Sequence, residues 1–244
     1  MITLTINIIK IAFLLGFLII IHEGGHFLVA KLCKVKVNEF AIGFGPILLQ
    51  KQGKETKYVL RLIPLGGFVN MEGEEERSEE EGSFSKASIP KRIAIVLAGG
   101  LVNIIFGLLA YFIIIASYTD IANAIEALKF FGISMIDSLK MLVNGTAFRE
   151  EQLTGIVGIS EMVVETKGIV NYIYLIAVIS VSLGVTNLLP IPPLDGGKVV
   201  LLLLEAIRKK PLKENIEIQI QMAGFALMIA LTIFVTYKDI IRLN

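Results

Sequence analysis

Four long apolar runs divide the chain, and more polar stretches containing glycine and proline separate them. The runs cover about residues 8–32, 93–118, 169–189 and 218–236. Each is close to 20 residues or longer, which is the length that a helix needs to cross the hydrocarbon core of a membrane. The pattern therefore predicts a mainly α, polytopic membrane protein with four transmembrane helices in a single domain, 1–244.

The stretch 34–70, between the first and second runs, is too broken by glycine and proline to span as a helix. Val35 and Val37 alternate with lysines there, and a period of two is typical of strands. We therefore predict a membrane-associated β-rich segment between helices 1 and 2, either as hairpins or as a re-entrant loop shielded by protein. The acidic run 72–81 that follows is interpreted as a solvated, mobile loop.

Residues 121–143 show a different pattern, in which apolar residues recur at helical spacing among charged ones. This mixture is typical of an amphipathic helix that lies on the membrane surface. Asn144-Gly145 ends the pattern, and the glycine-punctuated stretch 154–159 is expected to lead into the third span.

Composition supports a membrane protein and excludes other classes. The chain has 244 residues, of which 55% are hydrophobic, and its mean hydropathy of +0.75 is too high for a soluble domain. We therefore expect membrane lipids around it. A formal net charge of +1 gives no electrostatic case for nucleic-acid binding. The single cysteine, Cys33, excludes an internal disulfide framework.

The first apolar run contains the pattern H-E-x-x-H, as His22-Glu23-Gly24-Gly25-His26. The two histidines, the only ones in the chain, project from one helix face and can reach one metal ion. Glu23 can take a proton from the attacking water, and Zn²⁺ suits imidazole and carboxylate ligands. A chance match is the alternative, but such groups inside a membrane cost several kcal/mol unless they are paired, which favours a bound metal.

Two further polar residues lie in or beside the spans, where each needs a partner. The third run ends in three prolines and a glycine pair that must break its helix, and Asp195 lies in this break as the natural third ligand. It could also cap the following helix, a role that stabilises by about 1 kcal/mol and is compatible with metal binding. A lone intramembrane residue such as Asn103 most often makes a helix–helix contact, with a substrate contact as the alternative.

The distribution of lysine and arginine predicts the topology. Eleven lie between Lys31 and Arg92 and five lie in the 190–216 connection, against six in the loop and C-terminus on the far side. The excess favours a cytosolic location for the first two regions, which puts the N-terminus outside. The histidine motif and the Asp195 loop then approach from the same, cytosolic side.

These motifs resemble the site-2 protease family of intramembrane zinc metalloproteases, and within it the bacterial branch typified by the regulator of sigma-E protease. The stretches that carry the resemblance are residues 22–26, 43–46, 64–67 and 187–197. The resemblance implies Zn²⁺ held by His22, His26 and Asp195, with Glu23 as the general base. It also implies that the β-rich segment guides an unwound substrate and that Asn187 lies near the substrate backbone.

The resemblance further implies hydrolysis of a peptide bond within or near a substrate transmembrane helix, as in regulated intramembrane proteolysis. The expected partners are single-pass transmembrane proteins, such as anti-sigma factors or signal-peptide remnants, in the bacterial plasma membrane. Backbone groups of Tyr58–Ile63 are expected to add a substrate strand, and Asn103 and Asn187 are candidate substrate contacts. Members of this branch usually carry PDZ domains between the second and third spans. The roughly 50 residues 119–167 are too few for one, because a domain takes about 100.

The alternative function is a catalytically silent metal-binding membrane scaffold or a transporter. Glu23 argues against the scaffold, because a site that only binds metal needs no base. The chain also lacks the repeated polar path across several spans that transport requires.

Overall fold

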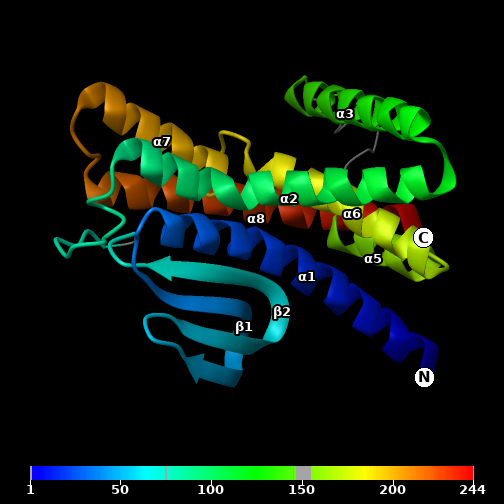
Figure 1. Ribbon diagram of the computed structural model, residues 1–244, viewed down its shortest axis with the longest axis horizontal. Coiled ribbons are helices and arrows are strands. Elements are labelled where there is room, and N and C mark those ends of the chain that lie inside the picture. Colours follow the sequence, from blue (N-terminus) through cyan, green and yellow to red (C-terminus); the bar gives the residue numbers. More distant parts are fainter. Residues whose placement is uncertain (1, 75, 145, 147–154, 244) are drawn as a thin grey trace.

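The computed structural model describes residues 2–74, 76–144, 146 and 155–243 (Figure 1). Its helices are α1 (Ile2–Leu32), α2 (Ile89–Tyr118), α3 (Ile121–Val143), α5 (Ile156–Glu165), α6 (Ile169–Asn187), α7 (Asp195–Arg208) and α8 (Glu214–Leu243), and its strands are β1 (Val37–Gln52) and β2 (Lys57–Met71). In the described part of the chain, α1, α2, α6 and α8 are long and apolar enough to cross a membrane. The predicted four-span architecture, with a β-rich segment between the first two spans, is confirmed.

Small residues let the spans approach one another closely. A Cβ on Gly25 of α1 would lie 2.6 Å from the carbonyl oxygen of Ala98 on α2, and a Cβ on Gly184 of α6 would lie 2.4 Å from that of Gly100. These contacts bring helix backbones together, as is usual between membrane helices. The helix α2 is therefore packed between α1 and α6.

The strands β1 and β2 form a small antiparallel sheet beside α1 (Figure 1). Gly43 and Gly45 have φ values of +88° and +82°, a region that glycine adopts easily, and β1 bends there. Because both strands bend, residues 39–42 of β1 have partners on both sides, 67–70 on one and 57–60 on the other. The stretch Gly67–Met71 pairs on one side only.

The described residues of the segment between the second and third spans form α3 and α5. The predicted helix 121–143 is observed as α3, whose Phe131 stacks on Tyr111 of α2 with 4.6 Å between ring centroids. The stretch expected to lead into the third span begins a separate helix, α5. Its Gly155 and Gly158 N–H groups donate to the buried Asp239 carboxylate of α8, each at 3.0 Å.

The acidic run after β2 has partners that the sequence did not indicate. Glu74 forms an ion pair with Lys198 of α7, and Glu72 accepts a hydrogen bond from Asn38 at 2.9 Å. The Arg77 guanidinium donates to the Leu212 carbonyl just before α8. Residues 76, 77 and 79–81 are exposed, as expected of a solvated loop, but the described part of the run is also fastened to the sheet, to α7 and to the start of α8.

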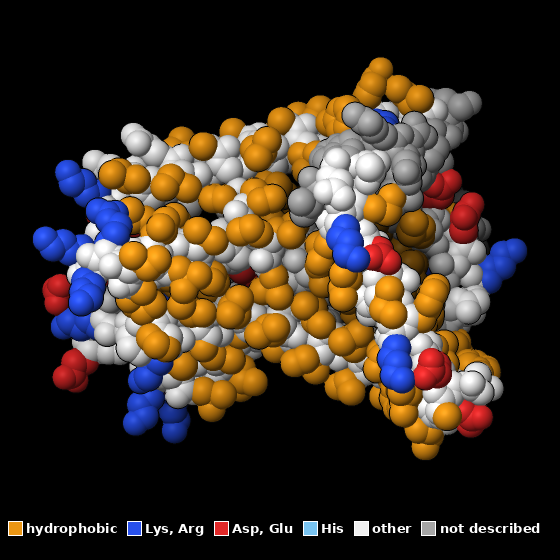
Figure 2. All heavy atoms as spheres, turned by 90° about the horizontal axis from the view of Figure 1, so that it is seen from above, with side chains coloured by type: hydrophobic (Ala, Val, Ile, Leu, Met, Phe, Trp, Pro, Cys, Tyr) orange, Lys and Arg blue, Asp and Glu red, His pale blue; other side chains and the backbone are white. Residues whose placement is uncertain are grey.

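Charged side chains gather at the ends of the molecule. Figure 2 shows a band of hydrophobic side chains across the middle, with a cluster of lysine and arginine at the left-hand end. At that end α1 finishes and α2 begins, whereas both chain termini lie at the other end (Figure 1).

Candidate metal centre

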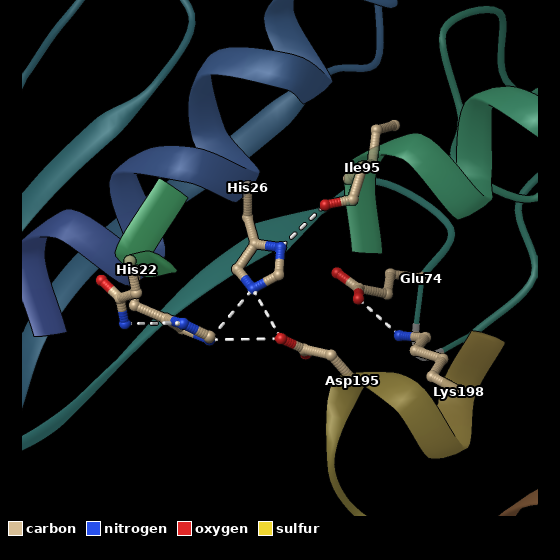
Figure 3. Close-up of polar contacts among 7 residues, drawn as sticks. His22, His26, Glu74, Ile95, Asp195 and Lys198 are labelled. Atoms are coloured by element: carbon tan, nitrogen blue, oxygen red, sulfur yellow. Dashed lines mark hydrogen bonds and ion pairs between the residues drawn. The ribbon is translucent and has the colours of Figure 1, made fainter. Parts of the chain in front are cut away.

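The helix α1 presents His22 and His26 on one face, and the turn after α6 brings Asp195 to them (Figure 3). The two Nε2 atoms lie 3.3 Å apart. Oδ2 of Asp195 lies 3.3 Å from Nε2 of His22 and 3.4 Å from Nε2 of His26. The three atoms therefore form a nearly equilateral triangle.

This triangle fits a tetrahedral zinc ion. Zinc–ligand bonds of about 2.0–2.1 Å at tetrahedral angles separate the ligand atoms by about 3.3–3.4 Å. Oδ2 of Asp195 is buried and, among the described residues, makes no hydrogen bond. Two imidazoles and a carboxylate are also ligands that zinc prefers, and the three side chains form a candidate metal site by proximity alone.

The protein fixes the proton of one imidazole directly. Nδ1 of His26 lies 2.8 Å from the carbonyl oxygen of Ile95 on α2. A carbonyl can only accept, so Nδ1 carries the proton. Nε2 then has a lone pair that it can offer to a metal bound by the three atoms of the triangle.

Asp195 would bind a metal as its carboxylate, because a ligand must be deprotonated. The interpretation of Asp195 as an N-cap is wrong, because Leu194 is the capping residue of α7 and no side chain caps this helix. Asp195 is the first residue of α7, where the positive end of the helix dipole favours a negative charge.

Glu23 and the triangle open into one cavity of about 770 Å³, a size typical of ligand sites. Its walls come from α1, the stretch Gly67–Met71 of β2, the acidic run, the turn before α7, and α8. Gly67 packs closely on the base, since a Cβ there would lie 3.0 Å from Cγ of Glu23. A proton acceptor, a metal site and a strand paired on one side only thus face the same space.

The structure brings His22, Glu23, His26 and Asp195 together. Of the other candidates, Tyr58–Ile63 and Asn187 do not line the cavity, whereas Asn103 lies beside His22. Tyr58, Val59 and Leu60 have partners on both sides within the sheet, so the prediction that the backbone of Tyr58–Ile63 adds a substrate strand is wrong for these three residues. The rest of that stretch, residues 61–63, does not line the cavity. Asn187 ends α6 and does not line the cavity. Asn103 contacts His22.

Sequence reasoning missed several parts of the site. The Ile95 carbonyl carries no signal, because every residue has one. The edge at Gly67–Met71 and the room that Gly99 leaves for the imidazoles were marked only by glycine pairs, Gly66-Gly67 and Gly99-Gly100. Glycine pairs in an apolar context indicate close approach without naming what approaches.

Two histidines and an aspartate around a metal site, with a glutamate beside them in a bundle of membrane-length helices, define a membrane-embedded metal-dependent hydrolase. Residues 10–231 match the family model described as Peptidase family M50, and the chain belongs to this family, that of the site-2 proteases. It is therefore a zinc metalloendopeptidase of the intramembrane type.

Relatives match along nearly the whole chain. A protein of Clostridium acetobutylicum named as a zinc metalloprotease is 31% identical and covers 96% of this chain and 97% of its own length. Proteins with the same description from Fusobacterium nucleatum and Campylobacter jejuni are 26% and 27% identical, covering 94% and 98% of this chain and 97% and 94% of their own. The first alignment extends over 331 positions, so that relative carries residues with no counterpart among the 244 here.

Proposed function

We propose that the protein cleaves single-pass membrane proteins within or near their transmembrane helices, at a site that opens to the cytosol of a bacterium. The observation that carries this proposal is that Glu23 and the His22, His26 and Asp195 triangle share one cavity with a strand paired on one side only. Anti-sigma factors and signal-peptide remnants are substrates of the required kind, because each offers one apolar helix.

The depth of the site supports cleavage inside the membrane. His26 and His22 precede the end of α1 at Leu32 by six and ten residues, or about 9–15 Å at 1.5 Å per residue. The ligands therefore lie below the end of the span that is rich in lysine and arginine. The excess of positive residues at that end supports a cytosolic orientation, with the N-terminus outside.

The residues around the triangle supply the rest of the chemistry. When bound, zinc polarises the scissile carbonyl and makes a water molecule acidic enough to attack at neutral pH. Glu23 accepts the proton of that water and then delivers it to the leaving amine, as a general base and acid. Gly67 packs against Glu23 and limits its movement toward the sheet.

A helical substrate must unwind before it can be cut, because its carbonyls are held in its own hydrogen bonds. The stretch Gly67–Met71 offers backbone groups that β1 does not use, and it borders the cavity. An unwound substrate segment can pair there as an added strand. This pairing offsets the several kcal/mol that each unsatisfied backbone group costs away from water.

The proposed enzyme is a single protease domain without a PDZ domain. In the described part of the connection between α2 and α6, α3 and α5 account for most residues. Selection of substrates then depends on the cavity and the strand edge.

The test is Glu23→Gln, which preserves the size of the side chain and removes its basicity. We expect zinc content close to the parental value and cleavage of a single-pass substrate in liposomes lowered by about 10²–10⁴-fold, the usual contribution of a general base. Glu126→Gln, on the exposed surface of α3, is the matched control and should cleave normally. Parental cleavage by Glu23→Gln would remove Glu23 from the mechanism.

A further inference from the structure

Residues of α2 contact both histidines at Nδ1, the ring nitrogen that faces away from Asp195. Nδ1 of His26 donates to the Ile95 carbonyl, and Nδ1 of His22 lies 3.4 Å from the side-chain amide of Asn103. The helices α1 and α2 lie side by side and run in opposite directions (Figure 1), so the earlier histidine meets the later residue of α2. Each ring thus directs Nδ1 toward α2 and Nε2 toward Asp195 (Figure 3).

The amide of Asn103 has an oxygen without a partner. Its side chain is fully buried, and among the described residues its Oδ1 accepts no hydrogen bond, while its Nδ2 faces Nδ1 of His22, nitrogen to nitrogen. A half-turn of the amide about its last torsion exchanges Oδ1 and Nδ2, because the two atoms occupy equivalent positions. Oδ1 then accepts from Nδ1–H of His22, and Nδ2 takes the position that Oδ1 had.

The position of the His22 proton decides whether this ring can bind a metal. A neutral imidazole carries one proton, so a proton on Nδ1 leaves the lone pair on Nε2, and the reverse blocks Nε2. Nε2 of His22 is 3.3 Å from both Nε2 of His26 and Oδ2 of Asp195. With the proton on Nδ1, three lone pairs converge on one point, which is what a cation requires.

We propose that Asn103 is a positioning residue that accepts a hydrogen bond from Nδ1 of His22 and thereby directs Nε2 to zinc. The inference rests on the zinc site of the proposed function and replaces the expected substrate contact of Asn103. An amide suits this place because it adds no charge. The carboxylates of Glu23 and Asp195 already balance a divalent cation, and a further charge at membrane depth is costly.

The helix α6 holds the backbone of Asn103 in place. Oγ of Ser180 donates to the Asn103 carbonyl oxygen at 2.9 Å, and both residues are fully buried. One turn further along α2, a Cβ on Gly107 would lie 2.5 Å from the Ala177 carbonyl oxygen. The amide therefore projects from two closely packed helices, as precise orientation of a ligand requires.

Two substitutions distinguish a role of the Asn103 side chain as a hydrogen-bond acceptor from a role as a donor. Asn103→Leu has the same number of side-chain heavy atoms with the same branching and can neither accept nor donate, whereas Asn103→Asp keeps an acceptor oxygen in the same shape. Zinc affinity is measured by chelator competition on the purified chain without substrate. We expect about 10- to 100-fold weaker zinc binding for Asn103→Leu and a clearly smaller loss for Asn103→Asp, which keeps the acceptor but adds a charge. Asn171→Leu, exposed on α6, is the control and should bind zinc normally.

Other outcomes would overturn the proposal. Equal losses in both variants would make Asn103 a donor, and parental affinity in Asn103→Leu would remove it from the metal site. Normal zinc binding with a raised KM would assign it to substrate. None of these results bears on Glu23→Gln, so the proposed protease function is tested separately.

Nitrogen-15 labelling of histidine tests the same proposal without a substitution. His22 and His26 are the only histidines in the sequence, so every histidine signal reports on this site. In the zinc-loaded protein we expect both rings to carry their proton on Nδ1 and to bind zinc through Nε2. A His22 ring protonated on Nε2 would refute the proposal even if neither Asn103 variant folds.

Discussion

Gly99 leaves the space that both imidazoles occupy. A Cβ at this position of α2 would lie 2.3 Å from Nε2 of His26 and 2.8 Å from Cε1 of His22. No real side chain tolerates such distances, so any substitution must displace the rings. The residue contributes to the metal site by its lack of a side chain.

Gly99→Ala should therefore weaken the site although it removes no ligand. We expect zinc affinity to fall by at least about tenfold, comparable to the loss of a supporting contact, and cleavage to fall with it. Gly24→Ala is the matched control, because a Cβ on Gly24 meets nothing within 4 Å among the described residues. It should keep zinc and stabilise α1 by up to about 1 kcal/mol in thermal unfolding. Normal zinc affinity in Gly99→Ala would show that the rings can shift at no cost.

The sequence allows the metal ligands to be predicted better than what supports them. His22, Glu23 and His26 follow a spacing that only a helix makes meaningful, and Asp195 lies in a break that prolines impose. The hydrogen-bond partners of the histidines follow no such rule. Ile95 contributes a backbone carbonyl, and for Asn103 the sequence left open a contact with a neighbouring helix, with a substrate or with a loop.

At the scale of elements, the two edges of β2 along Gly67–Met71 face different neighbours: one faces β1 and the other faces the cavity. Successive residues of a strand direct their N–H and C=O groups alternately to one side and the other. Along Gly67–Met71, one set pairs with β1 and the other set borders the cavity. Any strand added by a substrate must use the second set.

A proline scan from Phe68 to Met71 should therefore alternate in its effects. A proline that removes an N–H used by β1 should lower the melting temperature, whereas one that removes an N–H facing the cavity should lower cleavage by about tenfold with normal stability and zinc. The same scan from Leu49 to Lys51, which pairs on one side with 58–60, is the control for prolines remote from the cavity. If every folded Phe68–Met71 variant cleaves at the parental rate, substrate is held elsewhere.

The helices were easier to predict than the sheet. A long apolar run in a membrane forms a helix, because a helix satisfies all its backbone groups internally. The bounds of α3 follow from charged residues at helical spacing. The period of two in residues 34–70 indicates strands but not which neighbour each will meet. The bend at Gly43 and Gly45 lets one stretch pair on both sides, which moved the expected substrate strand from Tyr58–Ile63 to Gly67–Met71.

At the scale of the whole molecule, the two ends differ in charge and in content. One end holds the acidic run, the last turns of α7 and a cluster of lysines and arginines, and the other holds the chain termini (Figures 1 and 2). The distribution of charge should fix the orientation of the bundle in its membrane.

Cysteine labelling tests this orientation. In a Cys33→Ser background we would introduce Lys86→Cys, in the exposed stretch before α2, or Lys167→Cys, between α5 and α6. An impermeant maleimide added to intact cells should label Lys167→Cys at once and Lys86→Cys only after permeabilisation. The reverse pattern would place the active site outside the cytosol.

The ligands are far apart in the order of synthesis. His22 and His26 are translated first, whereas Asp195 follows only after most of the 244 residues have been made. A nascent chain therefore holds two ligands of three and cannot build the triangle. The enzyme can bind zinc through all three ligands only after Asp195 has been translated, so a copy that stops before Asp195 leaves the proteins inserted beside it intact.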